Sequence, residues 1–122
     1  MFSRDDFDYI NNISKSHFAI KQFNGHDISL HSLMTGHDWI IVTFYDRPNC
    51  ILFHRHSSKH PYHRQHGNYH SLQHSIDYIL SHEEWTLQKE EQRKKMSNMR
   101  KITHRPEYKH ELATKQVHIL HF

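Results

Sequence analysis

Histidine is strongly over-represented in this chain, at 16 of 122 residues. Eight of the 16 fall between His54 and His82, separated by as few as one, two or three residues. Imidazole is the commonest metal-binding side chain in proteins, and its pKa near neutrality leaves much of it in the neutral form that a metal requires. The clustering therefore predicts a site for a divalent transition metal, and we expect Zn²⁺.

Seven histidines within 21 residues are the candidate ligands. They are His54, His56, His60, His63, His66, His70 and His74. Side chains two residues apart on a strand, such as His54 and His56, share a face, as do side chains four apart on a helix, such as His70 and His74. With the histidines of the loop between them, we expect the strand, the loop and the helix to bring their ligands to one point. Zinc takes four ligands in a tetrahedral array. Our first choice of four is His63, His66, His70 and His74. Two ions, or one shared between chains, remain open alternatives.

The remaining histidines and the cysteine receive structural interpretations. Four histidines are expected at surface or turn positions: His17, His26, His31 and His37. His118 and His121 add ligands only if the tail folds back. Asp77 is placed one helical turn after His74, where it can orient a ligand ring. Cys50 is the only cysteine, so an internal disulfide is excluded, which fits a reducing compartment. We expect Cys50 to be a small buried apolar residue.

Alternating and β-branched segments predict the scaffold that positions these side chains. Ser3 with Asp5 and Asp6 predicts a helix over Arg4–Asn12. Strands are expected at 17–23, 26–34, 37–45 and 50–56, the third being the richest in β-branched and aromatic residues. Turns separate them at Thr35–Gly36 and Asp46–Asn49.

The C-terminal half is expected to be helical after a polar loop at 57–69. Ser71 is a plausible N-cap for a helix with an apolar stripe, and residues 83–100 have high helix propensity with mixed charge. The fold class is therefore α+β: a three- to four-stranded antiparallel meander, a short N-terminal helix, and one or two helices after a His-rich, metal-binding loop. We expect one domain over residues 1–122, in which residues 83–122 either pack along an edge or form a protruding helix and tail.

Bulk composition limits the function. The formal charge is +3, with 16 Lys and Arg against 13 Asp and Glu, too balanced to predict nucleic-acid binding from charge alone. Hydrophobic residues are only 35% of the chain, so a structural metal would supplement a modest core. The longest apolar run, 39–42, cannot span a bilayer, and the acidic N-terminus lacks the apolar segment of a signal peptide. We expect a cytoplasmic protein without membrane contact, and the sequence leaves its oligomeric state open.

Two alternatives use the histidines differently. A nuclease of the HNH type combines a strand, a loop and a helix, as found around Asn68, but its histidines must be chosen here from many. Its general-base role would fall to one of them. A zinc-containing nucleic-acid-binding module would use the basic residues at 93–95 and 100–101, which share their helix with four glutamates. HExxH, P-loop and GxGxxG motifs are absent, so we do not expect an enzyme.

In overall character the chain resembles small phage-encoded anti-CRISPR inhibitors of Cas9. The resemblance covers its size, its single-domain layout and its mixture of acidic and basic residues, and it matches no residue to a family position. It implies a phage protein in the host cytoplasm that binds Cas9 and blocks loading or cleavage of DNA. From expected exposure, the candidate contacts are Trp85, the charged faces of 83–100 and the tail.

Overall fold

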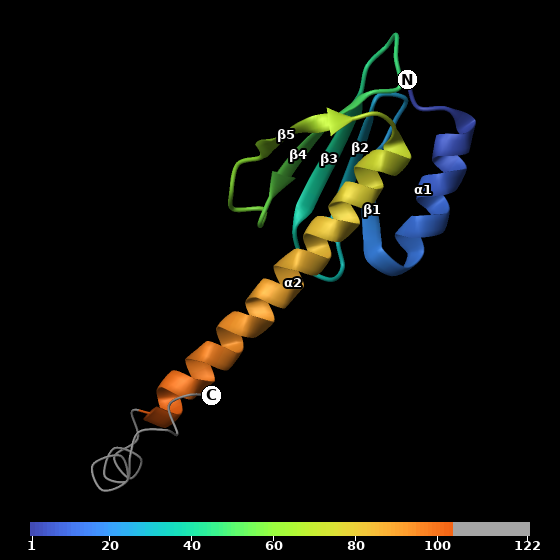
Figure 1. The fold of residues 1–122 in the computed structure, drawn as a ribbon. Coiled ribbons are helices and arrows are strands. Elements are labelled where there is room, and N and C mark those ends of the chain that lie inside the picture. Colours follow the sequence, from blue (N-terminus) through green and yellow to red (C-terminus); the bar gives the residue numbers. More distant parts are fainter. Residues whose placement is uncertain (104–122) are drawn as a thin grey trace, which may run out of the picture. The chain divides into compact units, whose positions relative to one another are not determined.

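A computed structural model describes residues 1–103, without the side chains of Ser14 and of residues 100–103. The elements are α1 (Arg4–His17), β1 (Phe18–Phe23), β2 (Asp27–Ser32), β3 (Asp38–Thr43), β4 (Cys50–Arg55), β5 (His63–Tyr69) and α2 (Leu72–Thr103). The strands form one antiparallel sheet in the order β1-β2-β3-β4-β5, which Figure 1 shows with its two helices. The predicted α+β meander is confirmed. The tail with His118 and His121 lies outside the described residues.

The sheet has one strand more than the three or four expected. β5 occupies most of the segment predicted as a polar loop, and it pairs with β4 through His54↔His63 and Phe53↔Arg64. Its side chains are mostly exposed, and β5 is the last strand at one edge of the sheet. A polar edge strand carries little of the alternating apolar pattern that identifies a half-buried strand, so the sequence pattern predicts a loop there.

α1 begins with a reciprocal cap. The backbone N–H of Asp6 donates to Ser3 Oγ at 3.2 Å, and the backbone N–H of Ser3 donates to Asp6 Oδ2 at 2.7 Å. The helix runs five residues beyond the predicted end and leads directly into β1. Ile10 on its inner face is fully buried, so α1 is held by the core as well as by its cap.

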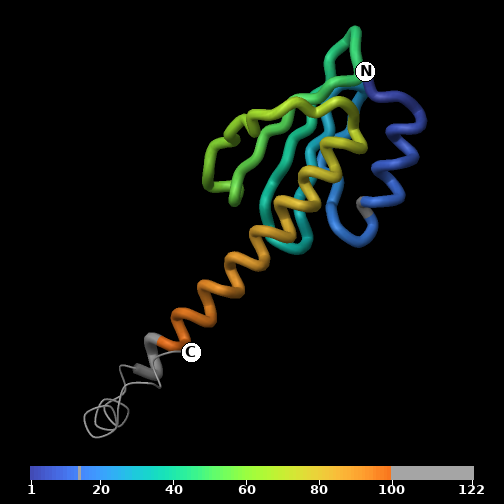
Figure 2. Tube along the Cα trace, in the orientation of Figure 1, coloured from blue at the N-terminus to red at the C-terminus, as the bar shows by residue number. Residues whose placement is uncertain are grey.

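Both helices contribute to one core on one face of the sheet. Alternate strand residues such as Trp39, Ile41 and Leu52 point to that face, where they meet Ile10 of α1 and Ile76 of α2 in a single buried cluster. Figure 2 traces the same path from α1 through the five strands into α2. The opposite face of the sheet is covered by no helix of Met1–Glu84.

α2 starts at a capped end and carries a buried acid three turns later. Ser71 Oγ accepts from the backbone N–H of His74 at 3.1 Å, as expected of an N-cap. Glu83, only 2% exposed, accepts from Trp39 Nε1 at 2.7 Å and from Ser32 Oγ at 3.0 Å. These bonds connect α2 to both ends of the turn between β2 and β3.

The contacts of the chain divide it into a unit of Met1–Glu84 and a second unit that begins at Trp85. The described part of the second unit is helical through Thr103. Trp85 is 54% exposed and Met96 57% exposed, and their separation of 11 residues places them on one side of the helix. Within residues 1–103, no helix has the length and apolar character needed to cross a membrane.

Candidate metal centre

Three imidazoles meet where β3 begins and β4 ends. The ligand nitrogens of His37, His54 and His56 all lie within 4.8 Å of one another. Antiparallel pairing brings them together, because Asp38 pairs with Arg55 and Trp39 pairs with His54. The residue before β3 consequently stands opposite the residue after β4, and the rings of His37 and His56 stack with centroids 4.5 Å apart. This group could hold a metal ion.

His54 lies at the centre of this group. Its Nε2 is 2.9 Å from His37 Nδ1, and its Nδ1 is 3.2 Å from Nε2 of Gln65. The indole of Trp39 stacks on its ring at a centroid distance of 4.0 Å. Gln65 also accepts from the hydroxyl of Tyr78 at 3.2 Å. Because an amide offers both a donor and an acceptor, Gln65 can serve either tautomer of His54.

The surroundings of His54 keep its ring neutral. Burial, followed by the nearby charges of His82, His37 and other imidazoles, lowers the pKa of His54 to about 3. Metal ions bind the neutral ring, so proton competition at His54 is weak at pH 7. Burial also lowers the pKa of His82, against an opposing effect of Glu83.

The ring of His82 on α2 lies next to this group, although its nitrogens are not among those that lie within 4.8 Å of one another. The ring centroid of His54 is 4.9 Å from His82, 5.0 Å from His37 and 5.2 Å from His56. We refer to His37, His54, His56 and His82 as the imidazole cluster. His37 and His54 are buried, His82 is half-buried and His56 is exposed. The cluster therefore combines a buried pair, His37 and His54, with the solvent-exposed imidazole of His56.

The structure places the seven predicted ligands in three different settings. His54 and His56 belong to the cluster. His63 is the cross-strand neighbour of His54 and is exposed, while His60 bonds through Nδ1 to Ser57 Oγ at 2.8 Å. His66 is exposed on β5. His70 and His74 lie at the start of α2, where the backbone N–H of His70 donates to His74 Nδ1 at 3.0 Å.

His37 and His82 were not among the predicted ligands. His37 does lie in a turn, as expected, but it is 8% exposed. The predicted strands 37–45 and 50–56, joined by a short turn, already place positions 37 and 56 at the same end of a hairpin. That hairpin geometry was the signal that could have identified His37 from sequence. His82 reaches the cluster only because α2 packs across the sheet, and no local spacing reveals this.

The turn before His37 is built to hold it. Gly36 has φ of 77°, a left-handed conformation that glycine adopts without steric cost. The Oγ of Ser32 accepts from the backbone N–H groups of Met34 and Thr35, at 3.2 and 3.1 Å. The carbonyl of His37 then accepts from the backbone N–H of Ser32 at 2.8 Å. The backbone of His37 is thus held in place independently of the contacts of its ring.

Comparisons with known proteins add no functional information here. No protein-family model, no curated protein and no solved structure matches this chain. The chemistry of the imidazole cluster is therefore the main guide to function.

Proposed function

We propose that this protein binds one Zn²⁺ ion through His37, His54 and His56, and that the ion stabilises the folded unit of Met1–Glu84. The observation that carries the proposal is the convergence of these three ligand nitrogens within 4.8 Å. Imidazole nitrogens around tetrahedral zinc stand roughly 3.3 Å apart, as follows from bonds of about 2.0–2.1 Å. His37 Nδ1 lies 2.9 Å from His54 Nε2, and no pair of the three ligand nitrogens is more than 4.8 Å apart, so ligation requires shifts of no more than about 1–2 Å.

The fourth position of the ion decides between a structural and a catalytic role. Three protein ligands and one water are typical of catalytic zinc, whereas four protein ligands are typical of structural zinc. We favour a structural site with His82 as the fourth ligand, because its ring already lies 4.9 Å from that of His54. Such a site would connect the β3–β4 hairpin to α2 through metal bonds.

Metal content and affinity test this proposal. Protein purified without a histidine tag is expected to contain one equivalent of zinc. Replacing the exposed His56 by Ala should weaken zinc binding at least about tenfold without unfolding the protein, because a ligand is lost while the core stays intact. His66→Ala is the matched control, since His66 is also exposed but lies outside the cluster. Equal losses in both variants, or no bound zinc, nickel or copper, would refute the proposal.

Removal of the metal tests its structural role. Zinc at 1,000 times its Kd contributes about 4 kcal/mol to folding, which corresponds to a shift in Tm of more than about 10 °C for a domain of this size. We expect a chelator to remove that stabilisation and His82→Ala to reduce it. If His82→Ala leaves the zinc-dependent shift unchanged, the fourth ligand is water and a catalytic role becomes the better proposal.

As its biological activity, we propose protein–protein binding through the part of α2 from Trp85 onward. The exposed Trp85 and Met96 on one side of that helix support this proposal, because an exposed tryptophan is a frequent anchor of protein interfaces. Cas9 inhibition is the specific activity that the sequence resemblance implies. The test is target-DNA cleavage by Cas9 with increasing amounts of this protein, and Trp85→Ala should weaken any inhibition.

The HNH-like nuclease and the nucleic-acid-binding module stay predictions, each with its own test. DNA cleavage with added Mg²⁺, Mn²⁺ or Zn²⁺ would identify the nuclease. Direct DNA binding with a steep salt dependence would identify the binding module. Neither activity is expected if the protein acts on Cas9 by binding it.

A further inference from the structure

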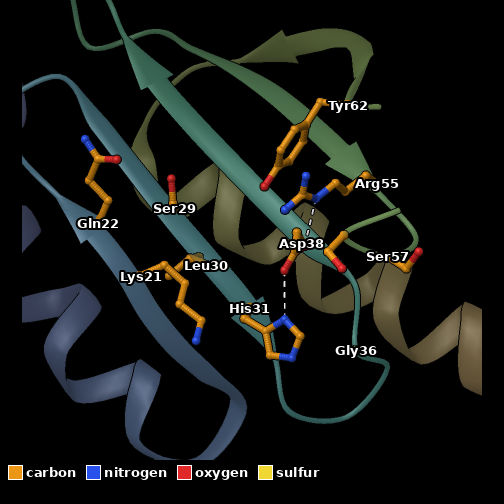
Figure 3. A pocket seen from close by; sticks show the side chains of 11 residues that line it. Lys21, Gln22, Ser29, Leu30, His31, Gly36, Asp38, Arg55, Ser57 and Tyr62 are labelled. Carbon is orange, nitrogen blue, oxygen red and sulfur yellow. Dashed lines mark hydrogen bonds and ion pairs between the residues drawn. The ribbon is translucent and has the colours of Figure 1, made fainter. Parts of the chain in front are cut away.

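A second polar site lies on the sheet face that the helices leave uncovered. It is a pocket of about 540 Å³, the size of a site for a small molecule. Its polar lining includes Lys21, His31, Asp38, Arg55, Ser57 and Tyr62. Figure 3 shows these side chains on β1, β2, β3 and β4 and on the segment that follows β4. Neighbouring residues on a strand point to opposite faces, so Arg55 faces this pocket while His54 faces the imidazole cluster.

Asp38, the one acid among the described residues of the lining, already has hydrogen-bonding partners. Asp38 Oδ2 accepts from Arg55 Nε at 2.8 Å, and its Oδ1 lies 2.7 Å from His31 Nδ1. Both oxygens therefore have hydrogen-bonding partners from within the pocket, as the dashed lines in Figure 3 show. Among the remaining polar groups, the ammonium of Lys21 can only donate, and the hydroxyls of Ser58 and Tyr62 can donate or accept.

Arg55 is held by contacts that leave its two terminal nitrogens available to donate hydrogen bonds. Asp38 takes its Nε, and its guanidinium carbon lies 4.3 Å from the centroid of the Tyr62 ring. Within residues 1–103, its two terminal nitrogens make no hydrogen bond with a protein group. A guanidinium fixed on one side and stacked on an aromatic ring is pre-organised for an oxyanion, since its planar fork matches such groups.

The charges of the pocket favour an anion. Lys21 and Arg55 each carry a positive charge, against the single negative charge of Asp38. A terminal phosphate carries nearly two negative charges on three acceptor oxygens, which suits the two cations Lys21 and Arg55 better than the single charge of a carboxylate does. We propose that this pocket binds a small molecule that carries a phosphate monoester group. Arg55 and Asp38 lie on the opposite face of the sheet from His54 and Trp39.

Titration of the full-length protein with inorganic phosphate tests the proposal. At constant ionic strength and pH 7.5, phosphate should shift the backbone amide NMR signals of Ser57 and Ser58 saturably, and acetate should bind more weakly. Adenosine 5′-monophosphate should give the same shifts, and adenosine should not. If phosphate produces no saturable shift, or acetate binds equally well, the proposal is overturned.

Two arginines allow a matched comparison. Arg47 also lies over an aromatic ring, 4.1 Å from the Phe44 centroid, but it does not line this pocket. Arg55→Gln should weaken phosphate binding about tenfold or more, because charge-assisted bonds are lost, while Arg47→Gln stays within about twofold. Equal losses would mean general electrostatic attraction and would refute the site.

Two further outcomes complete the test. The exposed Lys21 can be changed with little risk to the fold, so Lys21→Gln carries the test if Arg55→Gln does not fold. It should also weaken phosphate binding, and unchanged affinity would count against the pocket. If a single-stranded oligonucleotide binds far more tightly than the monophosphate and displaces it, the small-molecule assignment is wrong and the pocket is a backbone contact of a nucleic-acid site.

Discussion

The indole Nε1 of Trp39 on β3 donates a hydrogen bond to Oε1 of Glu83 on α2 over 2.7 Å. The other oxygen of Glu83 accepts from Ser32 Oγ, whose own lone pairs hold the turn that leads to His37. A single buried carboxyl group therefore connects the helix to the turn and to the ring on which His54 stacks.

Replacing Glu83 by Ala should destabilise the protein by about 2–4 kcal/mol. Two buried donors would lose their acceptor, and each costs roughly 1–3 kcal/mol when left unpaired. Urea unfolding measures the change, with the exposed neighbour in Glu84→Ala as the control. Comparable effects of both substitutions would show that the buried hydrogen bonds contribute little.

Gln65→Leu should lower zinc affinity about 10–100-fold with a smaller effect on folding. Partners that orient a ligand ring typically contribute this much to metal affinity, and Gln65 bonds directly to His54. Calorimetric titration with zinc measures the loss. Gln73→Leu makes the same chemical change at an exposed site on α2 and should have no effect.

Gly36→Ala should destabilise the protein by about 1 kcal/mol or more, because its φ of 77° is unfavourable for a residue with a β-carbon. Zinc binding should also weaken, since the strained turn carries His37. Gly36→Asn is the informative comparison, because asparagine tolerates the left-handed region better than alanine. An Asn variant as damaged as the Ala variant would point to a cause other than backbone strain.

Alkaline pH should destabilise the protein through Tyr69. Its hydroxyl is buried without a hydrogen-bond partner in the described residues, and burial, together with the neighbouring Tyr78, raises the pKa of Tyr69 to about 12. The unfolded chain loses this proton near pH 10, so the stabilisation is complete below pH 10 and disappears as the pH rises towards 12.

Unfolding free energies between pH 9 and 11.5 test this expectation. The loss should reach about 2 kcal/mol at the upper end and should be largely absent in Tyr69→Phe. Tyr45→Phe is the control, since Tyr45 is 81% exposed. If Tyr69→Phe keeps the same alkaline slope, another group is responsible.

His74→Ala should cost about 0.5–1 kcal/mol in stability and leave zinc affinity unchanged. Its Nδ1 caps the free backbone N–H of His70 at the start of α2, a role comparable to that of an N-cap side chain. Thermal melting and zinc titration separate the two effects. A large loss of zinc affinity would instead favour the ligand set first chosen from sequence, in which His70 and His74 bind the ion.

The sequence predicted those features that depend on local pattern. The strands richest in β-branched residues, the Ser3 and Ser71 caps and the turn at Gly36 follow from rules that act over a few residues. The sequence does not predict β5, because an edge strand requires backbone pairing but little alternation of apolar and polar side chains. Its register with β4 is a property of two segments together.

The sequence predicts a histidine cluster, but it identifies only two of the four members, His54 and His56. Density of histidine indicated a metal, and His54 and His56 were among the candidates. His37 is 17 residues away from His54 in sequence and joins it through strand pairing. Closeness in sequence favours His63, His66, His70 and His74 as ligands instead, because a spacing pattern describes only one segment of the chain.

The pairing of Asp38 with Arg55 has a consequence for how this chain can change over generations. A slip of β4 by one residue would turn His54 outwards and Arg55 inwards, because side chains alternate. The same slip would expose the buried Leu52, so the core and both proposed sites depend on one register of β4. An insertion in the loop between β3 and β4 is therefore expected to lengthen the loop and to leave this register in place.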